Sequence, residues 1–229
     1  MNPPVSVVIP ALDEAARLGA TLDRARAALP GCELIVADGG STDATVGLAA
    51  ARGATIVSAP RGRGRQLVAG AAAARGALLV FLHADTLLPP AAGPVLARAF
   101  ADPAVKIGTF RLAFDAPGLW YRGFAWCSRF DSVCTRFGDQ GIVVRREFYA
   151  ALGGFAPWPL FEDVDLLRRA RRRTRIHSFP AAVTTSARRF HRGGPVRQQL
   201  RNGWLLLRFL AGTSPETLAA SYRPESPSG

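Results

Sequence analysis

A histidine and an aspartate two residues apart carry the clearest chemical signal in the sequence. His83 and Asp85 directly follow an apolar stretch at residues 78–82. Alternation along an extended chain puts their side chains on the same side, where an imidazole and a carboxylate could hold a divalent cation such as Mn²⁺ or Mg²⁺. Such a cation neutralises a diphosphate leaving group. The pattern therefore predicts a metal site at a strand end, and a turn with a solvated aspartate is the alternative.

Three carboxylates gather within residues 161–165. Glu162, Asp163 and Asp165 stand at the expected start of a helix, where acidic side chains complement the helix dipole, so a structural role is one interpretation. A positioned carboxylate can also act as a general base and take the proton from an acceptor hydroxyl. Asp165 lies two residues beyond Asp163, so helical rotation turns it away, and we expect it to pair with an arginine.

Two glycine-rich segments suit a nucleotide. Residues 38–43 read Asp-Gly-Gly-Ser-Thr-Asp. The glycines permit a tight turn, Ser41 or Asp43 could cap the next helix, and the Asp38 carboxylate could bind a base or a ribose. Residues 61–66 read Arg-Gly-Arg-Gly-Arg-Gln, and backbone amides with guanidinium groups favour phosphate oxygens. A plain turn and a mobile basic loop are the alternatives.

A third group of polar and aromatic residues could bind the acceptor. Asp139 and Gln140 precede an apolar strand, where they could form a pocket wall or a simple turn, and we expect them to lie near Glu162. Trp158 stands in a Pro-Trp-Pro turn. Its aromatic face would suit the C–H side of a sugar ring.

Strand and helix patterns alternate along the first half of the chain. Strands are expected at residues 5–10, 33–38, 55–58 and 78–82, and helices at 14–29 (with Asp13 as the N-cap), 43–52 and 66–74. Further on we expect a half-exposed strand at 106–114, an aromatic-rich helix at 119–137, a strand at 140–145, a short helix ending at Leu152, and helices at 162–172 and 195–210. This order predicts an α/β domain with a parallel sheet covered on both faces. Ligands of such sheets bind beyond the carboxyl ends of the strands.

The composition fits one strongly basic domain. The 229 residues carry a net charge of +12, and every basic residue except Lys106 is an arginine, which implies either a polyanionic neighbour or a solvated basic surface. Cys32, Cys127 and Cys134 form no paired motif, which favours a reducing compartment. We find no signal peptide and no apolar run of transmembrane length, so a cytoplasmic location is expected. Aromatic residues within 119–130 leave peripheral contact with the inner face of the membrane open, beside packing in the core or lining a pocket.

The ordered set of motifs resembles the family 2 glycosyltransferases with the GT-A fold. Residues 7–14 are similar to their opening strand and nucleotide loop, and residues 38–43 to their second nucleotide motif. His83-Ala84-Asp85 occupies the place of their Asp-x-Asp motif, and Glu162-Asp163 that of their acidic acceptor-side motif. The resemblance is closest to a small subgroup with a Leu-His-Ala-Asp-Thr motif that is associated with radical-SAM genes and arsenosugar biosynthesis.

The resemblance implies a fold, an activity and a set of site residues. The fold is a single α/β domain of the GT-A, Rossmann-like type, with a mixed, mostly parallel sheet and helices on both faces. Residues 1–110 would bind the nucleotide sugar, residues 111–223 would bind the acceptor, and residues 224–229 would form a flexible tail. The activity is inverting, metal-assisted transfer of one sugar from a nucleoside diphosphate, UDP first, to an acceptor hydroxyl. The nucleotide-sugar residues would be Pro10, Ala11, Asp13, Glu14, Asp38, Gly40, Ser41, Arg65 and Ala84.

The remaining roles follow from the same resemblance. Asp163 would be the catalytic base with Glu162 beside it, and Asp85 would bind the Mn²⁺ or Mg²⁺ ion with His83. The histidine replaces the first aspartate of the family's metal motif, so less negative charge reaches the ion and its affinity is expected to be weaker. The Gln-x-x-Arg-Trp element of processive members is only approximated by residues 199–204, which favours a single addition.

Two other classes of protein compete with this interpretation. A sugar-phosphate nucleotidyltransferase would carry a basic, glycine-rich loop directly after its first strand, but Asp13 and Glu14 stand there. A nucleic-acid-binding module would explain the charge of +12, yet it has no need for acidic residues at one edge of the sheet. We therefore expect no nucleic-acid partner.

Overall fold

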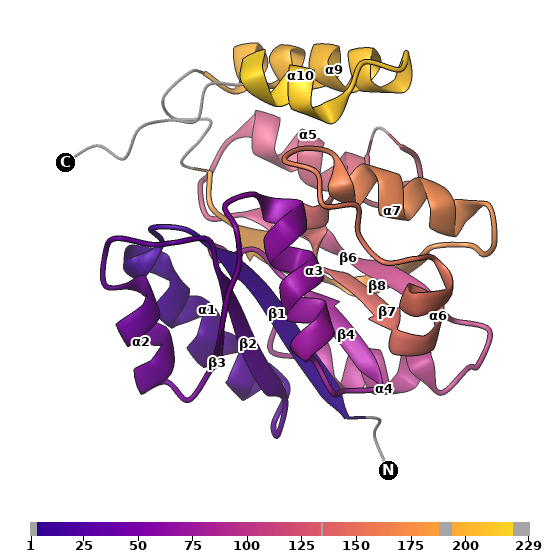
Figure 1. Cartoon of the computed structure of the whole chain (residues 1–229). Helices are drawn as coiled ribbons and strands as arrows, with labels where there is room; N and C mark the ends of the chain where they lie inside the picture. Colours follow the sequence, from indigo (N-terminus) through magenta and orange to yellow (C-terminus); the bar gives the residue numbers. More distant parts are fainter. Residues whose placement is uncertain (1–3, 134, 188–193, 222–229) are drawn as a thin grey trace.

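A mixed sheet of eight strands forms the centre of the protein, in the order β3-β2-β1-β4-β7-β6-β8-β5 (Figure 1). The computed structural model describes residues 4–133, 135–187 and 194–221. Strands β1 (Val5–Ala11), β2 (Glu33–Asp38), β3 (Thr55–Ser58) and β4 (Leu78–Phe81) are all parallel to their neighbours among these four. The parallel sheet expected for the first half of the chain is confirmed.

The second half adds strands of both directions. Strand β7 (Ile142–Arg145) runs antiparallel to β4 and to β6 (Ile107–Phe114), whereas β8 (His177–Thr185) runs parallel to β6. The short β5 (Thr86–Leu87) pairs antiparallel with β8. Strand β6 lies between β7 and β8 and is mostly buried, so the expectation of a half-exposed strand was wrong.

Helices cover both faces of the sheet. On one face, side chains of α1 (Ala15–Ala28), α2 (Thr45–Ala51) and α4 (Ala92–Phe100) form one apolar cluster with Val7 and Ile9 of β1. On the other face, side chains of α3 (Arg63–Ala73), α6 (Arg146–Ala151) and α7 (Glu162–Arg171) form a second apolar cluster with Val8. Val8 stands between Val7 and Ile9 in β1 and points to the opposite side of the sheet. This two-sided burial explains why β1 is a continuous apolar run.

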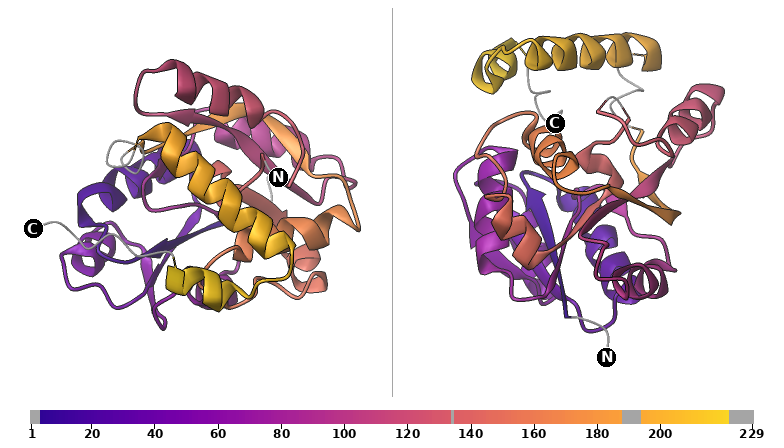
Figure 2. Two further views of the ribbon diagram at one scale, coloured as in Figure 1. Left: turned by 90° about the horizontal axis from the view of Figure 1, so that it is seen from above. Right: turned by 90° about the vertical axis from the view of Figure 1, so that its right-hand side faces the viewer.

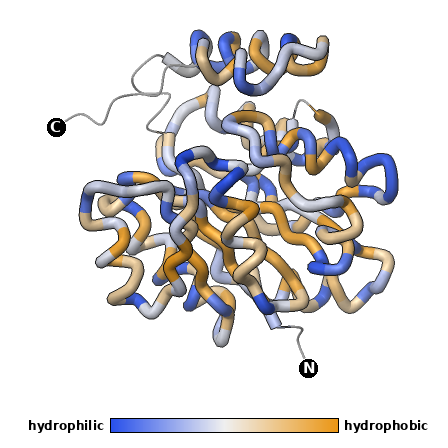
Figure 3. The backbone as a smooth tube through the Cα atoms, viewed as in Figure 1, coloured by the Kyte–Doolittle hydropathy of each residue, from blue (hydrophilic) through white to orange (hydrophobic). Residues whose placement is uncertain are grey.

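A further layer lies beyond the carboxyl ends of the parallel strands. It contains α9 (Pro195–Leu210) and α10 (Pro215–Ser221), with α5 (Leu119–Cys127) below it (Figures 1 and 2). Leu205, Leu206 and Phe209 of α9 form a third apolar cluster with Val164 of α7 and Leu218 of α10. The strands of the sheet are mostly hydrophobic (Figure 3). The predicted flexible tail at residues 224–229 lies outside the described residues.

Several boundaries differ from the sequence prediction for identifiable reasons. Helix α5 ends at Cys127 instead of residue 137, because the Ser128 hydroxyl accepts the Leu112 amide at 3.0 Å and ties the chain to β6. Asp13 is not the N-cap of α1: its φ is +52°, and its carboxylate accepts the Thr42 amide at 2.8 Å. The Asp43 carboxylate, from the loop after β2, accepts the Ala15 amide of α1 instead, at 3.1 Å.

Candidate active site

The loops that follow β1 and β2 are joined into one structure at the carboxyl edge of the sheet. The Asp38 carboxylate accepts the amides of Gly40 at 2.9 Å and Ser41 at 3.1 Å, and the Ser41 hydroxyl accepts the Asp13 amide at 3.0 Å. Gly40 has a φ of +93°, which only glycine adopts without strain. Ala11 pairs with Asp38 in the sheet register. The residues predicted for the nucleotide on β1 and β2 therefore lie together.

Gln66 fixes α3 against this edge, a role that the sequence did not reveal. Its buried side-chain amide donates to the carbonyls of Ala11 at 2.7 Å and Ala37 at 2.9 Å. Ala11 is the last residue of β1, and Ala37 is the next-to-last residue of β2. The arginine side chains of the basic segment before Gln66 lie in different places. Arg65 is exposed and lies outside the cavity described below, whereas Arg63 lines that cavity.

A cavity of about 510 Å³ lies between the sheet edge and α9. His83 and Asp85 both line it, whereas the side chain of Ala84 between them packs into the core with α1 and α4. The Ala84 carbonyl accepts the Thr21 hydroxyl at 2.8 Å, which anchors this turn. Within the described residues no group of three or more His, Cys, Asp or Glu side chains is placed to hold a metal ion. A pair on an open cavity wall fits a catalytic cation with free coordination positions better than a closed structural site.

Asp163 reaches the same cavity from the first turn of α7. Its Oδ2 atom accepts the Gly138 amide at 2.6 Å, and its Oδ1 atom accepts the Val164 amide at 2.8 Å. A Cβ atom at Gly138 would lie 3.0 Å from Oδ2 of Asp163 and 3.3 Å from Nε2 of His83. Gly138 therefore lies between the carboxylate and the imidazole and leaves room for both.

Glu162 is not part of the cavity wall, although it directly precedes Asp163 in the sequence. It is fully buried, does not line the cavity, and its Oε1 atom binds Nε of Arg63. Burial raises the pKa of Glu162, while the charge of Arg63 opposes this change. Burial alone would lower the pKa of Arg63, but the carboxylates of Glu162, Asp163 and Asp139 outweigh it and hold the pKa above its ordinary value. Arg63 is thus a permanent cation among three carboxylates.

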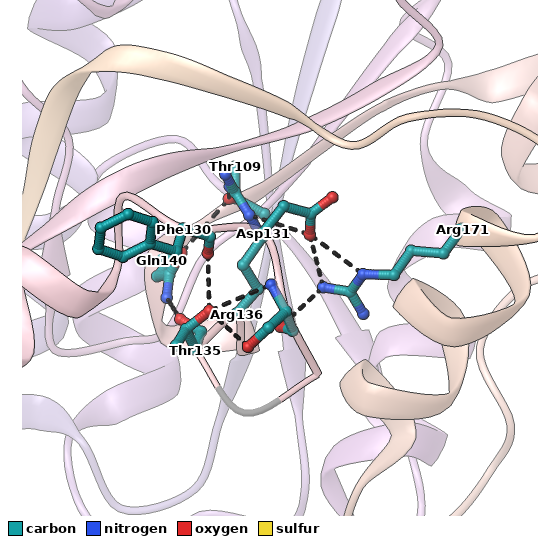
Figure 4. Close-up of polar contacts among 8 residues, drawn as sticks. Thr109, Phe130, Asp131, Thr135, Arg136, Gln140 and Arg171 are labelled. Atoms are coloured by element: carbon teal, nitrogen blue, oxygen red, sulfur yellow. Dashed lines mark hydrogen bonds and ion pairs between the residues drawn. The ribbon is translucent and has the colours of Figure 1, made fainter.

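Another part of the cavity wall comes from the 3₁₀ helix η1 (Gly138–Gln140) and the loop before it. Asp139 and Gln140 line the cavity, and the charge of Asp139 acts on Arg63, the ion-pair partner of Glu162. Gln140 is buried; its carbonyl accepts the Thr109 hydroxyl at 3.4 Å and its amide donates to the Thr135 carbonyl (Figure 4).

A buried arginine that the sequence prediction missed supports this wall. Arg136 is 1% exposed, donates to the Thr109 hydroxyl and forms an ion pair with Asp131 at 3.3 Å (Figure 4). Asp131 also accepts from Arg171 of α7 at 2.8 Å. Burial lowers the pKa of Arg136. In the sequence Arg136 is one arginine among many, and no local pattern distinguishes it from an exposed one.

Trp158 lies outside the cavity wall. Its ring packs edge-on against Phe209 of α9 with 6.0 Å between the ring centroids, and its carbonyl accepts the Gly64 amide at 3.1 Å. The aromatic lining at this point comes from Phe161 instead. Helix α9 closes the cavity with polar and apolar side chains, namely those of Gln198, Gln199, Asn202, Leu205, Leu206 and Leu207.

The sequence and the fold are similar to those of known proteins. The sequence model of glycosyl transferase family 2 matches residues 6–152. Glucosyl-3-phosphoglycerate synthase of Mycolicibacterium paratuberculosis is 40% identical over 96 residues, which are 37% of this chain and only 29% of that relative.

Two solved structures show the same fold at low identity. The glucosyl-3-phosphoglycerate synthase of Mycobacterium tuberculosis with Mn²⁺, UDP-glucose and phosphoglyceric acid superposes with a TM-score of 0.62 at 23% identity, covering 87% of this chain and 78% of that one. The mannosyltransferase PcManGT of Pyrobaculum calidifontis with GDP-Man and Mn²⁺ gives a TM-score of 0.67 at 20% identity, covering 96% and 69%. The expected GT-A fold is confirmed, and neither alternative class is favoured. Because the family model spans more than half of the chain, this protein belongs to the family 2 glycosyltransferases.

Proposed function

We propose that this glycosyltransferase moves one sugar from a nucleoside diphosphate, UDP first, to an acceptor hydroxyl, with inversion at the anomeric carbon. The edge formed by the loops after β1 and β2 would bind the nucleotide, through Pro10, Ala11, Asp13, Glu14, Asp38, Gly40, Ser41, Arg65 and Ala84. The cavity would bind the acceptor. Residues 1–110 thus serve the donor and residues 111–223 the acceptor, although Arg63, His83 and Asp85 also line the acceptor cavity.

The position of Asp163 carries this proposal. It lies on the wall of the cavity that also holds His83 and Asp85, whereas Glu162 is buried against Arg63. The acceptor oxygen attacks the anomeric carbon while the bond to the diphosphate breaks, and its proton passes to the Asp163 carboxylate. Two backbone amides hold that carboxylate in place, so it is oriented before the acceptor arrives. Glu162 acts through Arg63 as a positioning residue.

His83 and Asp85 would hold the divalent cation. A bound Mn²⁺ or Mg²⁺ supplies positive charge to the departing diphosphate. Two protein side chains leave coordination positions for phosphate oxygens and water. The related synthase was crystallised with Mn²⁺ and UDP-glucose, and with Mg²⁺ and UDP, which supports such a cation here.

The donor and acceptor are the finer part of the proposal. The synthase binds a UDP-sugar and phosphoglyceric acid, whereas the mannosyltransferase binds GDP-Man. We favour UDP because a segment of this chain is 40% identical to a glucosyl-3-phosphoglycerate synthase. The Leu-His-Ala-Asp-Thr motif at residues 82–86 supports membership of the radical-SAM-associated subgroup, and single addition rests on the imperfect Gln-x-x-Arg-Trp element.

A donor panel tests the proposal directly. Thermal shifts are measured with UDP-, GDP- and dTDP-sugars in the presence of Mn²⁺, because a ligand of the folded state raises its stability by mass action. A UDP-sugar is expected to give the largest shift, and free UDP should appear when a hydroxyl acceptor is added. A larger shift with GDP-sugars would mean that the donor carries guanine instead of the proposed uracil. The absence of a shift with every nucleotide sugar would overturn the assignment of the β1–β2 edge.

A further inference from the structure

Exposed hydrophobic side chains are concentrated beside the cavity. Among the residues that the structure describes, nine large hydrophobic side chains are exposed, and eight of them lie on α9 or between Leu119 and Phe130. The eight are Leu119, Trp120, Trp126, Phe130, Leu200, Trp204, Leu207 and Leu210. We call them the α5–α9 surface. Scattered exposed residues are ordinary, but a concentrated group of this kind marks an interaction site.

Helix α9 is apolar on two sides. Its inner side contributes Leu205, Leu206 and Phe209 to the third apolar cluster. On its outer side Leu200, Trp204 and Leu207 follow each other at spacings of four and three residues, which places them on one helix face. The inner side is satisfied by the protein itself, so the outer side is available to a partner.

Positive charge surrounds the same surface. Residues 116–130 and 194–215 contain no Asp or Glu, but they include five arginines: Arg122, Arg129, Arg197, Arg201 and Arg208. The Arg208 guanidinium lies 4.7 Å from the centroid of the Trp204 ring, an arrangement in which a cation and an aromatic face act together. A suitable partner must therefore be apolar and negatively charged at once.

We propose that the α5–α9 surface docks the protein on an anionic lipid bilayer. Such a bilayer offers negative headgroups to the arginines and an apolar interior to the tryptophans and leucines. A second copy of the chain would bring arginines against arginines, which is unfavourable. A nucleic acid would satisfy the charge but would leave Leu200 and Leu207 without an apolar partner.

Docking would bring the mouth of the cavity to the lipid. Leu207 lines the cavity and is also 65% exposed, so the cavity reaches the protein surface at this helix. Cys127 and Gln199 are likewise exposed and line it. An acceptor could then enter from the membrane side. The docking itself does not depend on sugar transfer and is measured without it.

Cosedimentation with vesicles tests the inference on the full chain. We expect binding to phosphatidylcholine mixed with phosphatidylglycerol, no binding to phosphatidylcholine alone, and release by salt. Arg122→Gln with Arg197→Gln should weaken binding roughly 25-fold, at about fivefold per arginine. Leu200→Ser with Trp204→Ser should weaken it by at least about tenfold, because apolar burial is lost.

Matched controls come from other exposed positions. Arg75→Gln with Arg98→Gln removes the same charge far from α9, and Val68→Ser removes the ninth exposed hydrophobic side chain, on α3. Both should bind like the wild type. Absence of binding to the mixed vesicles would overturn the inference. So would a self-associated form of the protein that does not bind vesicles and that Leu200→Ser with Trp204→Ser converts to monomer. Displacement of the protein from vesicles by RNA or DNA at equal charge would overturn it as well.

Discussion

Replacement of Asp163 by asparagine should separate the chemical role of this residue from its structural role. Both carboxylate oxygens accept backbone amides, from Gly138 at 2.6 Å and from Val164 at 2.8 Å. Asparagine keeps the shape but has one acceptor oxygen, so one of the two amides must face an NH₂ group. The loss of a buried hydrogen bond of this kind costs about 1–3 kcal/mol of unfolding free energy. At roughly 2–4 °C per kcal/mol, the Tm should fall by about 2–12 °C.

The transfer rate should fall much further than this loss of stability explains. Removal of a general base lowers kcat by about 10²–10⁴-fold. The hydrogen bonds of the loops after β1 and β2 run among Asp13, Asp38, Ser41 and Thr42, whereas the Asp163 carboxylate accepts from Gly138 and Val164. The KM for the donor should therefore stay nearly constant. The assay follows release of the nucleoside diphosphate at a temperature well below the Tm of the variant.

Asp165→Asn is the matched control for the same chemical change. Asp165 forms an i,i+4 ion pair with Arg169 at 2.7 Å, and such pairs contribute only about 0.3–0.5 kcal/mol. This variant should transfer sugar at close to the normal rate. If Asp163→Asn is nearly fully active while a folded Glu162→Gln is inactive, the base lies one residue upstream. If both remain active, the reasoning from the cavity wall is refuted.

Four further substitutions test the surroundings of the proposed base. Arg63→Met should lower the unfolding free energy by about 3–5 kcal/mol, because Glu162 stays buried without its cation. Without Arg63 the pKa of Glu162 rises further, so the Tm difference from the wild type should shrink at lower pH and widen at higher pH. A Tm difference that does not depend on pH would contradict this. Asp85→Ala should abolish transfer while His83→Asp retains it and binds Mn²⁺ more tightly, and full activity after exhaustive chelation would remove the metal from the mechanism. Gly138→Ala should reduce kcat with little change in donor KM, because its Cβ would press on the carboxylate and the imidazole, and wild-type kinetics would show that this turn relaxes freely.

The structure of the first half of the chain was largely predictable because its signals are local. The strands of this half are short apolar runs, and a polar residue follows the end of each of β1, β2 and β4 within two or three positions, namely Asp13, Ser41 and His83. The parallel order then brings those residues to one edge without further information. Two details escaped: Asp13 caps no helix but accepts the Thr42 amide, and Gln66 binds two carbonyls from different strands. Both depend on contacts between segments that are distant in the sequence.

The structure of the second half of the chain was harder to predict because it depends on distant pairings. Strand β8 contains Pro180 and lacks regular alternation, yet it pairs with β6 through most of its length. The helix expected at 119–137 stops at Cys127, where Ser128 and Asp131 are held by β6 and α7. Aromatic residues that would ordinarily indicate a core, such as Trp120 and Trp126, are exposed here.

The choice between Glu162 and Asp163 shows where sequence reasoning reaches its limit in this protein. Both are acidic, adjacent and at the start of the same helix, so periodicity cannot rank them. The rotation of α7 about its axis decides which carboxylate lines the cavity. This rotation follows from Phe161, whose φ of +62° turns the chain into the helix, and from Arg63, which binds the buried carboxylate of Glu162. Gly138 then meets the other carboxylate with its amide at the cavity wall. The placement of Asp163 on the cavity wall and of Glu162 against Arg63 therefore depends on partners 25 and 99 residues away along the chain.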